Sequence, residues 1–407
     1  MATNSSNFHG SAPRRAHRSG TRKGRASRSR RHSVGRHSVR LLGWCWHIFL
    51  WLLLLGAVSA RYISPNWFII PAYLGLAFPG ILLLFLVDYL ILFVRRKWWQ
   101  AAGQSLVLLL SWSTVVTYCP VRFGYPSPPA APGGFDTLRV LSLNADAFFR
   151  NPQNKELAEL PAIRYINETD AQIVCLQEAF YEGEKGKSVT EENILKFCPA
   201  YKYVKELGAQ PSTSSRIALV SKYPIGSMRR LPIESVFNGG VVFSVRLPAG
   251  ELAVYNLHLE SFRVTKDDEE LYLKDVQEDP LSLSGKVHRK LAPAFRTRAL
   301  QCAVVRRDLE KQTAPYVLIC GDLNDTPVSY TLSHVVPRGY IDCFKHAGRG
   351  PGLSYYMNWG AFRLDHAFAS PSLIPVRAQI DTQADVSDHK PLLLTFLIPK
   401  PHPAPEA

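Results

Sequence analysis

The stretch Tyr316-Val-Leu-Ile-Cys-Gly-Asp-Leu-Asn324 sets the pattern of this chain, because an unbroken apolar run ends on a carboxylate, Asp322, and an amide, Asn324. Similar polar endings recur in Leu257-His258-Leu259, Arg363-Leu-Asp365-His366 and Ser387-Asp388-His389. Carboxylate and amide oxygens are hard ligands for divalent cations, and histidines exchange protons near neutral pH. The pattern therefore indicates metal-assisted attack of water on a phosphate ester.

Two further polar residues close apolar runs nearer the N-terminus. Asn144 ends Arg-Val-Leu-Ser-Leu-Asn, and Glu178 ends Ile-Val-Cys-Leu-Gln-Glu. An acid that closes a buried strand is costly unless it is exposed at a sheet edge or bound to a cation. Asp322 and Asn324 would face the same side if their strand continued through both. Taken singly, Asn144 or Glu178 could also be a loop cap. The Ser387-Asp388-His389 motif could also form an Asx-turn before Pro391.

The surrounding pattern predicts one large α/β domain over residues 136–398, with ligands placed where strands end. Helical periodicity covers 155–166 and 294–311. The expected strands are 138–144, 172–177, 216–221, 241–247, 252–257, 316–320, 363–369 and 391–397. Residues 399–407 form a short tail. The stretch 263–298 has blocks of alternating charge without a strand pattern, and we expect an insertion over the rim of the site or a solvated helix face.

The net charge of +15 is concentrated near the N-terminus. Of 48 Lys and Arg and 33 Asp and Glu, 15 bases and one acid precede residue 121, which leaves 33 bases and 32 acids in the rest of the chain. A nonspecific nucleic-acid binder normally clusters positive charge, because neutralising phosphates provides most of its affinity. The near-neutral domain therefore favours a lipid head group, a nucleotide or another small phosphoester.

Residues 41–120 read as a membrane region with three transmembrane helices, since apolar runs cover 41–59, 66–94 and 101–118 and a span needs about 20 residues. The third run also fits a buried core helix. The basic tail 1–40 is expected to be disordered, cytoplasmic and close to anionic lipid. With Arg95-Arg96-Lys97 inside as well, three spans place the domain outside the cytoplasm, whereas two spans keep it inside. Residues 121–135 form a Pro/Gly linker.

Seven motifs occur in the order found in one known superfamily: SLNA (142–145), CLQE (175–178), SKYPI (221–225), YNLHLES (255–261), GDLND (321–325), RLDHAF (363–368) and SDHKP (387–391). On these motifs the chain resembles the endonuclease/exonuclease/phosphatase superfamily of deoxyribonuclease-I-like metal-dependent hydrolases, in its membrane-anchored bacterial form. The resemblance implies a four-layer αββα sandwich, preceded here by the transmembrane helices, with Mg²⁺ or Mn²⁺ at one rim.

The resemblance also implies roles for individual residues. Glu178 would be the main metal ligand, helped by Asn144 and Asp388. His389 would activate water with Asp365 orienting its imidazole, while Asp322 positions the water. His258 would donate to the oxyanion or the leaving group. Substrate contacts are expected from Asn324, Arg216 and Asn238. His366 and Arg216 depart from the common pattern, which bears on the shape of the substrate pocket. Glu260 is expected to make structural hydrogen bonds.

The predicted function is thus a membrane-anchored phosphodiesterase or phosphomonoesterase without an obligate protein partner. An extracytoplasmic nuclease and a catalytically silent scaffold are the alternatives. Clustered carboxylates are costly in a silent domain, which favours the enzyme. Other hydrolase and nucleotide-binding motifs are missing from the sequence: Gly186-Lys187-Ser188 lacks the earlier glycine of a phosphate loop, and neither GxSxG nor HExxH occurs. The cysteines do not form a disulfide pattern, although Cys198, Cys302 and Cys343 could pair in an oxidising compartment.

Overall fold

The computed structural model describes residues 22–122, 133–148, 160–179, 189–211, 215–263, 268, 280–358 and 360–400. Most of the predicted linker and the Gly186-Lys187-Ser188 stretch lie outside these residues. The chain divides into two compact units, Met1–Leu50 and Trp51–Ala407. The described part of the first unit belongs to helix α1 (Arg22–Ser59), whose last nine residues belong to the second unit.

Helix α1 begins at Arg22, well before the first apolar run. Residues 22–40 are therefore helical, whereas their composition predicts disorder, and residues 1–21 lie outside the described part. Arg and Lys are good helix formers, so they allow a helix that forms in the apolar run 41–59 to extend backwards. Within the described residues, Leu41–Ser59 is the single continuous helix that is long and apolar enough to cross a membrane.

The second and third predicted spans differ from expectation. Helices α2 (Ile70–Leu76) and α3 (Phe78–Val94) are bent by 70° at their junction, so they make one broken span or a re-entrant segment. Helix α4 (Trp98–Tyr118) forms over the third run but is less apolar than a span requires. Its Gln, Ser and Thr side chains explain that difference. The described residues thus contain one candidate span, or two if the bent pair counts.

Two six-stranded sheets dominate the second unit among the described residues. The first has the order β13-β14-β1-β2-β4-β3, and the second β5-β6-β7-β8-β12-β9. The strands of the first sheet are β1 (Phe135–Asn144), β2 (Ile173–Gln177), β3 (Tyr203–Gly208), β4 (Arg216–Ser221), β13 (Ile374–Ile380) and β14 (Leu392–Pro399). The strands of the second are β5 (Ile225–Arg230), β6 (Gly239–Leu247), β7 (Gly250–His258), β8 (Tyr316–Asp322), β9 (Ile341–Asp342) and β12 (Asp365–Ala369).

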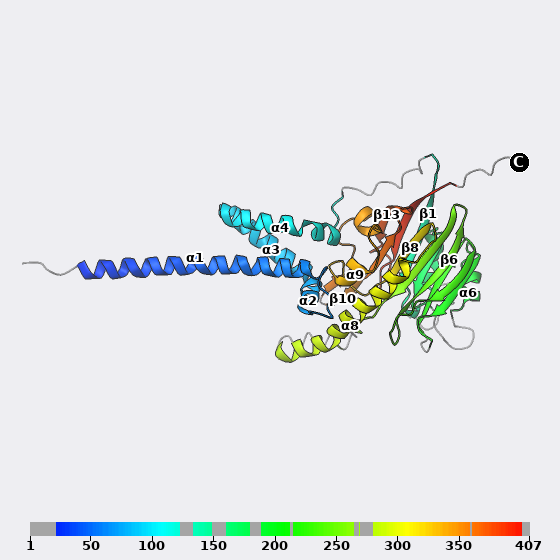
Figure 1. The fold of residues 1–407 in the computed structure, drawn as a ribbon, viewed down its shortest axis with the longest axis horizontal. Helices are drawn as coiled ribbons and strands as arrows, with labels where there is room; N and C mark the ends of the chain where they lie inside the picture. Colours follow the sequence, from blue (N-terminus) through cyan, green and yellow to red (C-terminus); the bar gives the residue numbers. More distant parts are fainter. Residues whose placement is uncertain are drawn as a thin grey trace, which may run out of the picture. The chain divides into compact units, whose positions relative to one another are not determined.

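The sheets pack face to face, and helices cover their outer faces (Figure 1). The core between the sheets takes Val140 from β1, Phe243 from β6 and Leu318 from β8. Helices α5 (Pro161–Glu168) and α6 (Glu191–Phe197) pack on the first sheet, and α8 (Pro280–Leu309) and α9 (Tyr330–His334) on the second. The arrangement is a mixed α/β sandwich with two large sheets, as predicted. Strands β2 and β8 are buried along their whole length because both of their faces are covered.

All eight predicted strands are present, with boundaries shifted by a few residues. The strands β3, β5 and β13 were not predicted, and each lies at the edge of a sheet. Four residues of β5 are exposed, and β13 carries Pro375 and a register shift. Edge strands are less apolar and tolerate irregularity, so their sequence signal is weak. Helix α8 starts 14 residues before the predicted 294, and the described part of the 263–298 insertion is therefore largely helical.

The cysteines are all free thiols. Cys198 lies in the core under α5 and α6, Cys302 in the core under α8, and Cys343 in the core between the sheets. Because a sheet separates each of these cores from the next, the disulfide pairing left open by the sequence does not form.

Candidate active site

Strand pairing brings the predicted catalytic residues to one edge of the sandwich. In the second sheet, His258 pairs with Asp322 across the parallel strands β7 and β8, and Asp322 pairs with Asp365 across the antiparallel strand β12. In the first sheet, Asn144 pairs with Gln177, the residue before Glu178. Each side chain therefore stands at the end of its strand on the same side of the fold. Residues far apart in the sequence meet there because hydrogen-bonded registers fix them.

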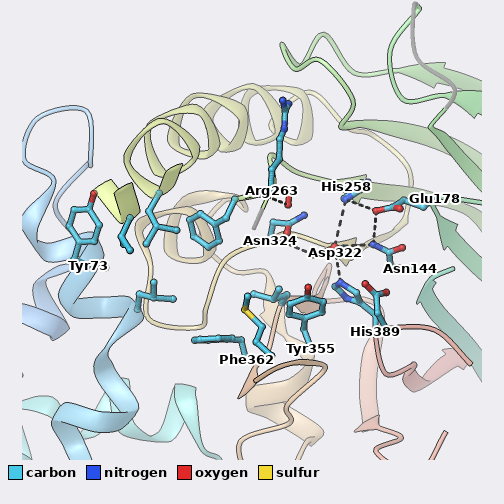
Figure 2. Close-up of a pocket in the computed structure, with 18 of the residues that line it drawn as sticks. Tyr73, Asn144, Glu178, His258, Arg263, Asp322, Asn324, Tyr355, Phe362 and His389 are labelled. Atoms are coloured by element: carbon cyan, nitrogen blue, oxygen red, sulfur yellow. Dashed lines mark hydrogen bonds and ion pairs between the residues drawn. The ribbon is translucent and has the colours of Figure 1, made fainter. Parts of the chain in front are cut away.

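A first cluster joins the two sheets through Asn144 (Figure 2). The Nδ2 atom of Asn144 donates to Glu178 Oε1 and to Asp322 Oδ2, at 3.1 Å in both cases. The Nε2 atom of His258 lies 3.6 Å from the same two carboxylate oxygens. Glu178 has a left-handed backbone (φ 48°), which is uncommon for a non-glycine residue. Such strained backbone conformations often occur at functional sites.

A second cluster contains the predicted Asp365–His389 pair. His389 Nδ1 donates to Asp365 Oδ2 at 2.8 Å, and His389 Nε2 lies 3.6 Å from Asp322 Oδ2. The ring of Tyr355 packs against the imidazole with centroids 4.8 Å apart. Because Nδ1 carries the proton that binds Asp365, Nε2 is the nitrogen left to exchange a proton with a reacting group. The pairing expected from the resemblance is therefore present in the structure.

The buried carboxylates and imidazoles of this site shift one another's pKa values. Burial works against a charged imidazolium at His389, but the carboxylates of Asp365 and Asp322 outweigh it and hold its pKa well above the usual range. Burial raises the pKa of Asp322, and Asp365 adds to this effect, whereas His389 and His258 oppose it. Such displaced titratable groups in a cleft are typical of catalytic sites.

Asn324 reaches the site by a turn rather than by a continued strand. Strand β8 ends at Asp322, and Asn324 has a left-handed backbone (φ 52°). Its backbone N–H donates to Asp322 Oδ1 at 2.9 Å, and its Nδ2 donates to the carbonyl of Leu259 at 3.0 Å. The strand therefore does not continue through both residues, so the condition for a shared side is not met, although Asn324 does line the pocket.

The oxygen donors of the site fit a divalent cation. Glu178, Asn144 and Asp388 all line the pocket, and Asp322 lies between the two histidines. A hard cation prefers carboxylate and amide oxygens, so this set suits Mg²⁺ or Mn²⁺. Among the described residues, the one group of three side chains spaced to hold an ion consists of Asp322, Asp365 and His389, whose ligand atoms lie within 4.8 Å of one another. In that group, His389 Nδ1 is already hydrogen-bonded to Asp365 Oδ2.

Two of the predicted substrate-binding residues do not reach the pocket. Arg216 forms an ion pair with Glu206 at 3.3 Å on the first sheet. Asn238 is buried, and its Nδ2 donates to the carbonyl of Leu259 at 3.0 Å. Neither residue lines the cavity. Arg216 starts strand β4, and Asn238 fixes the loop before β6.

His366 and Glu260 are structural. His366 is buried, and its Nε2 donates to the carbonyls of Asp325 and Arg363 at 2.9 and 3.1 Å, away from the pocket. His366 therefore does not line the substrate pocket, contrary to the expectation that its departure from the family pattern bears on the shape of that pocket. Glu260 accepts hydrogen bonds from Ser235 Oγ at 2.5 Å and from Arg263 Nη2 at 2.9 Å, which confirms its structural role.

The pocket has a volume of about 550 Å³, and its lining includes several residues that sequence reasoning missed. These are mainly apolar side chains from α2, from α8 and from the hairpin of β10 (Tyr355–Met357) and β11 (Gly360–Phe362). They were missed because an apolar side chain at a cavity wall has the same sequence pattern as one in a core. The insertion 263–298 was expected over the rim, and Arg263, Val287 and Leu291 do line the pocket.

The fold is a two-sheet α/β sandwich with carboxylates and imidazoles gathered at one edge. The chain belongs to the Endonuclease/Exonuclease/phosphatase family, whose profile matches residues 141–389, more than half of its length. A second profile, that of a domain of unknown function, matches residues 39–118. A comparison with curated proteins found no match.

Several solved structures are similar to this chain. They include the endonuclease/exonuclease/phosphatase from Beutenbergia cavernae DSM 12333, at 15% identity and a TM-score of 0.46, covering 65% of this chain and 72% of that one. D. rerio TDP2 complexed with single strand DNA product has 16% identity and a TM-score of 0.43, with coverages of 64% and 99%. ANGEL2, a 2',3'-cyclic phosphatase, has 13% identity and a TM-score of 0.45, with coverages of 66% and 97%.

Proposed function

We propose that this chain is a membrane-anchored, divalent-metal-dependent phosphoesterase that hydrolyses a phosphodiester or a phosphomonoester with activated water. The observation that carries the proposal is the hydrogen bond between His389 and Asp365. It leaves His389 Nε2 beside Asp322, and both residues line the pocket that Glu178 also lines. Family membership supports phosphoester hydrolysis as the reaction class.

The residues divide the chemistry between two sides of the pocket. His389, in the form that has released the proton from Nε2, and Asp322 would orient water and take its proton, with Asp365 holding the imidazole through Nδ1. His258 Nε2, on the other side of Asp322, would donate to the developing oxyanion or to the leaving oxygen. Glu178, Asn144 and Asp388 would hold Mg²⁺ or Mn²⁺, which would neutralise phosphate charge and polarise the phosphoryl oxygen.

The buried ring nitrogen His258 Nδ1 has no hydrogen-bond partner in the described structure. A buried polar atom without a partner is costly, and such atoms are found at catalytic sites. His258 Nδ1 thus has no carboxylate partner, in contrast to His389 Nδ1, which is bonded to Asp365. This asymmetry fits different roles for the two imidazoles, one as base and the other as donor.

The membrane anchor comprises α1 and the bent pair α2 and α3. The apolar stretch Leu41–Ser59 supports the tether. The matched profile over residues 39–118 treats this region as a unit of its own. Placement of the sandwich outside the cytoplasm requires α4 to cross as well, and it stays a prediction.

The first prediction tests the reaction class with the full chain in a mild detergent. We expect release of nitrophenolate from bis(4-nitrophenyl) phosphate in the presence of Mg²⁺ or Mn²⁺, and its loss on chelation. Asp322→Asn and His389→Ala should each lower kcat by about 10²–10⁴-fold, the usual contribution of a positioned acid or base. The readout is absorbance of nitrophenolate under initial-rate conditions.

Two surface variants control for nonspecific damage. Asp385→Asn changes a carboxyl that is 75% exposed, and His346→Ala changes an exposed imidazole, and neither residue lines the pocket. Both should retain the parent rate. An inactive parent across monoester and diester substrates would instead support a silent scaffold, and faster cleavage of DNA or RNA than of small esters would support the nuclease alternative.

A further inference from the structure

The catalytic pocket has two chemically different ends. At one end stand the carboxylates and imidazoles, including Glu178 and His389. At the other end the wall is built from Tyr73, Leu76 and Ala77 of the α2 region and from Leu291 of α8. Figure 2 shows Tyr73 across the pocket from His258 and Glu178, with Phe362 and Tyr355 along one side. The cavity therefore runs from the catalytic groups to the N-terminal apolar helices.

Helix α2 is held against the sandwich by specific contacts. The hydroxyl of Tyr73 is hydrogen-bonded to His288 Nδ1 at 2.7 Å, and its ring packs edge-on against Phe295 with centroids 5.5 Å apart. Gly75 approaches the catalytic domain so closely that a Cβ there would lie 2.4 Å from the carbonyl oxygen of Val328. Val328 lies on the segment that follows Asp322 and Asn324. The apolar wall is thus packed directly against the catalytic domain.

Helix α2, which lines the pocket, also belongs to the part of the chain that we assign to the membrane. Helix α2 is followed directly by the apolar α3, to which it is bent by 70°. Just before α2, Trp67 and Phe68 are exposed, at 81% and 49% of their surface. Exposed aromatic residues beside an apolar helix are typical of the membrane–water boundary. The apolar end of the pocket consequently adjoins helix α2, which we assign to the membrane anchor.

We infer that the substrate of this site is an amphiphilic phosphoester, a lipid whose phosphate lies among Glu178, Asp322 and His389 and whose hydrocarbon chain lies along the α2–α8 wall. This inference rests on the proposed function, because it takes the catalytic end as the phosphoester site. It specifies the class of substrate that this site accepts.

A hydrocarbon chain fits the wall better than a nucleotide does. Leu76, Ala77 and Leu291 offer no side-chain hydrogen bonds, so the polar edges of a base would be buried there without partners, which is costly. Among the described lining residues, Arg263 is the single Lys or Arg, and its guanidinium is already paired with Glu260 at 2.9 Å. A nucleic-acid strand would need several cations along its phosphates.

The test compares esters that share one reacting group. The full chain in a nonionic detergent, loaded with Mg²⁺ or Mn²⁺, is given the methyl, butyl and octyl diesters of 4-nitrophenyl phosphate below their aggregation limits. Burying one methylene favours binding by about fourfold. We expect kcat/KM to rise from methyl to octyl by roughly 100-fold, as if three or four methylenes were buried.

Two variants connect this rise to the wall. Leu291→Gln and Leu76→Gln each place an amide on the apolar wall, and each should reduce the octyl-to-methyl ratio of kcat/KM by about tenfold or more. Leu300→Gln is the matched control, because Leu300 lies on the same helix as Leu291 but is 62% exposed and outside the pocket. It should keep the parent ratio. A second readout without turnover is thermal unfolding, which octyl phosphate should shift upward more than methyl phosphate does.

The outcomes separate the two proposals. Hydrolysis of all three esters at similar kcat/KM, with no effect of Leu291→Gln or Leu76→Gln on the ratio, overturns the lipid inference and leaves the phosphoesterase standing. Faster cleavage of single-stranded DNA than of the octyl ester also overturns it. Failure to hydrolyse any ester contradicts the proposed function, and a greater thermal shift with octyl phosphate would then still support binding of an amphiphile.

Discussion

Among single residues, Asp322 has the central position. Its Oδ2 accepts from Asn144 and lies 3.6 Å from one ring nitrogen of each histidine, so it connects the two sheets and the two imidazoles. Its Oδ1 accepts from the backbone of Asn324. Removing its charge would affect water activation, the orientation of His258 and the turn after β8 together. For that reason Asp322→Asn, which keeps the shape, is more informative than Asp322→Ala.

His366 shows that a histidine within one of the family motifs can have a purely structural role. Its Nε2 donates to two backbone carbonyls, which requires a proton on Nε2. Burial, together with the charge of Arg363, lowers the pKa of His366 to about 3. The unfolded chain therefore takes up a proton at His366 near pH 6.5, whereas the folded chain does so only near pH 3. Stability contributed by this group is present above pH 6.5 and is lost as the pH falls.

The second prediction concerns this pH dependence. Between pH 7 and pH 5 the parent should lose about 2 kcal/mol of unfolding free energy through His366. His366→Gln keeps a donor for the two carbonyls but cannot be protonated, so its unfolding free energy should fall less over the same range. Chemical denaturation of the full chain in detergent at several pH values measures the difference. The exposed His346→Gln is the control, and equal slopes for all three proteins would contradict the assignment.

Arg363 is the other buried residue of that motif with a role at a distance. Its Nη2 donates to the carbonyl of Thr117 near the C-terminal end of α4, and its Nη1 donates to the carbonyl of Pro351, both at 2.8 Å. A cation near a helix C-terminus is stabilised by the partial negative charge of the unpaired carbonyls. Burial lowers the pKa of Arg363 to about 10, which still leaves it charged at neutral pH. The strand that carries Asp365 is thereby connected to α4.

At the level of elements, the close packing of α2 on the catalytic domain is the feature most easily tested. A Cβ at Gly75 would lie 2.4 Å from the carbonyl oxygen of Val328 and 2.6 Å from Ala60 Cβ. Neither neighbour is the flexible end of a long side chain, so the backbone itself would have to shift. Overpacking of this kind costs roughly 1–3 kcal/mol.

The third prediction is that Gly75→Ala lowers the unfolding temperature of the full chain and decreases turnover of the octyl ester. Gly80→Ala is the matched control, because a Cβ at Gly80 has nothing within 4 Å and the gain in helix propensity is the same. Thermal unfolding in detergent, followed by the chain-length assay, separates the two variants. Gly75→Ala behaving like Gly80→Ala would show that α2 is not packed on the sandwich as described.

For the whole molecule, the arrangement of three separate cores has a direct chemical consequence. Burial raises the pKa of Cys198 to about 11 and that of Cys302 to about 12, with Asp325 adding to the effect at Cys302. Cys343 is buried as well. Thiols of this kind carry almost no thiolate at neutral pH and react slowly.

The fourth prediction is that alkylation of the native full chain is limited to the half-buried Cys119, and to Cys45 where detergent or lipid does not cover its apolar helix. The remaining five cysteines should react only after denaturation. Mass spectrometry of peptides from native and denatured samples measures this, with the fully denatured, reduced chain as the reference. A disulfide between any two of Cys198, Cys302 and Cys343 in protein expressed in an oxidising compartment would contradict the separation of the cores.

Local patterning was enough to predict the strands that bury both faces, the carboxylates that end them and the family motifs. A continuous apolar run such as 316–320 can be stable only between two covering layers, so it carries its own signal. The motif order then assigned Glu178, His258, Asp322, Asp365 and His389 to one site. The strand registers place His258, Asp322 and Asp365 side by side, and side-chain contacts join Glu178 and His389 to them. The edge strands carried too little apolar signal to be predicted.

The tertiary structure alone determined the features that depend on contacts between segments distant in the sequence. The turn at Asn324, the position of Arg216 outside the pocket and the burial of His366 follow from neighbours that lie far away in the sequence. The apolar wall of the pocket is the largest such case, because Leu76 and Leu291 have the same pattern as core residues. An apolar side chain looks alike in sequence whether it packs in a core or faces a cavity, since its position depends on what stands opposite.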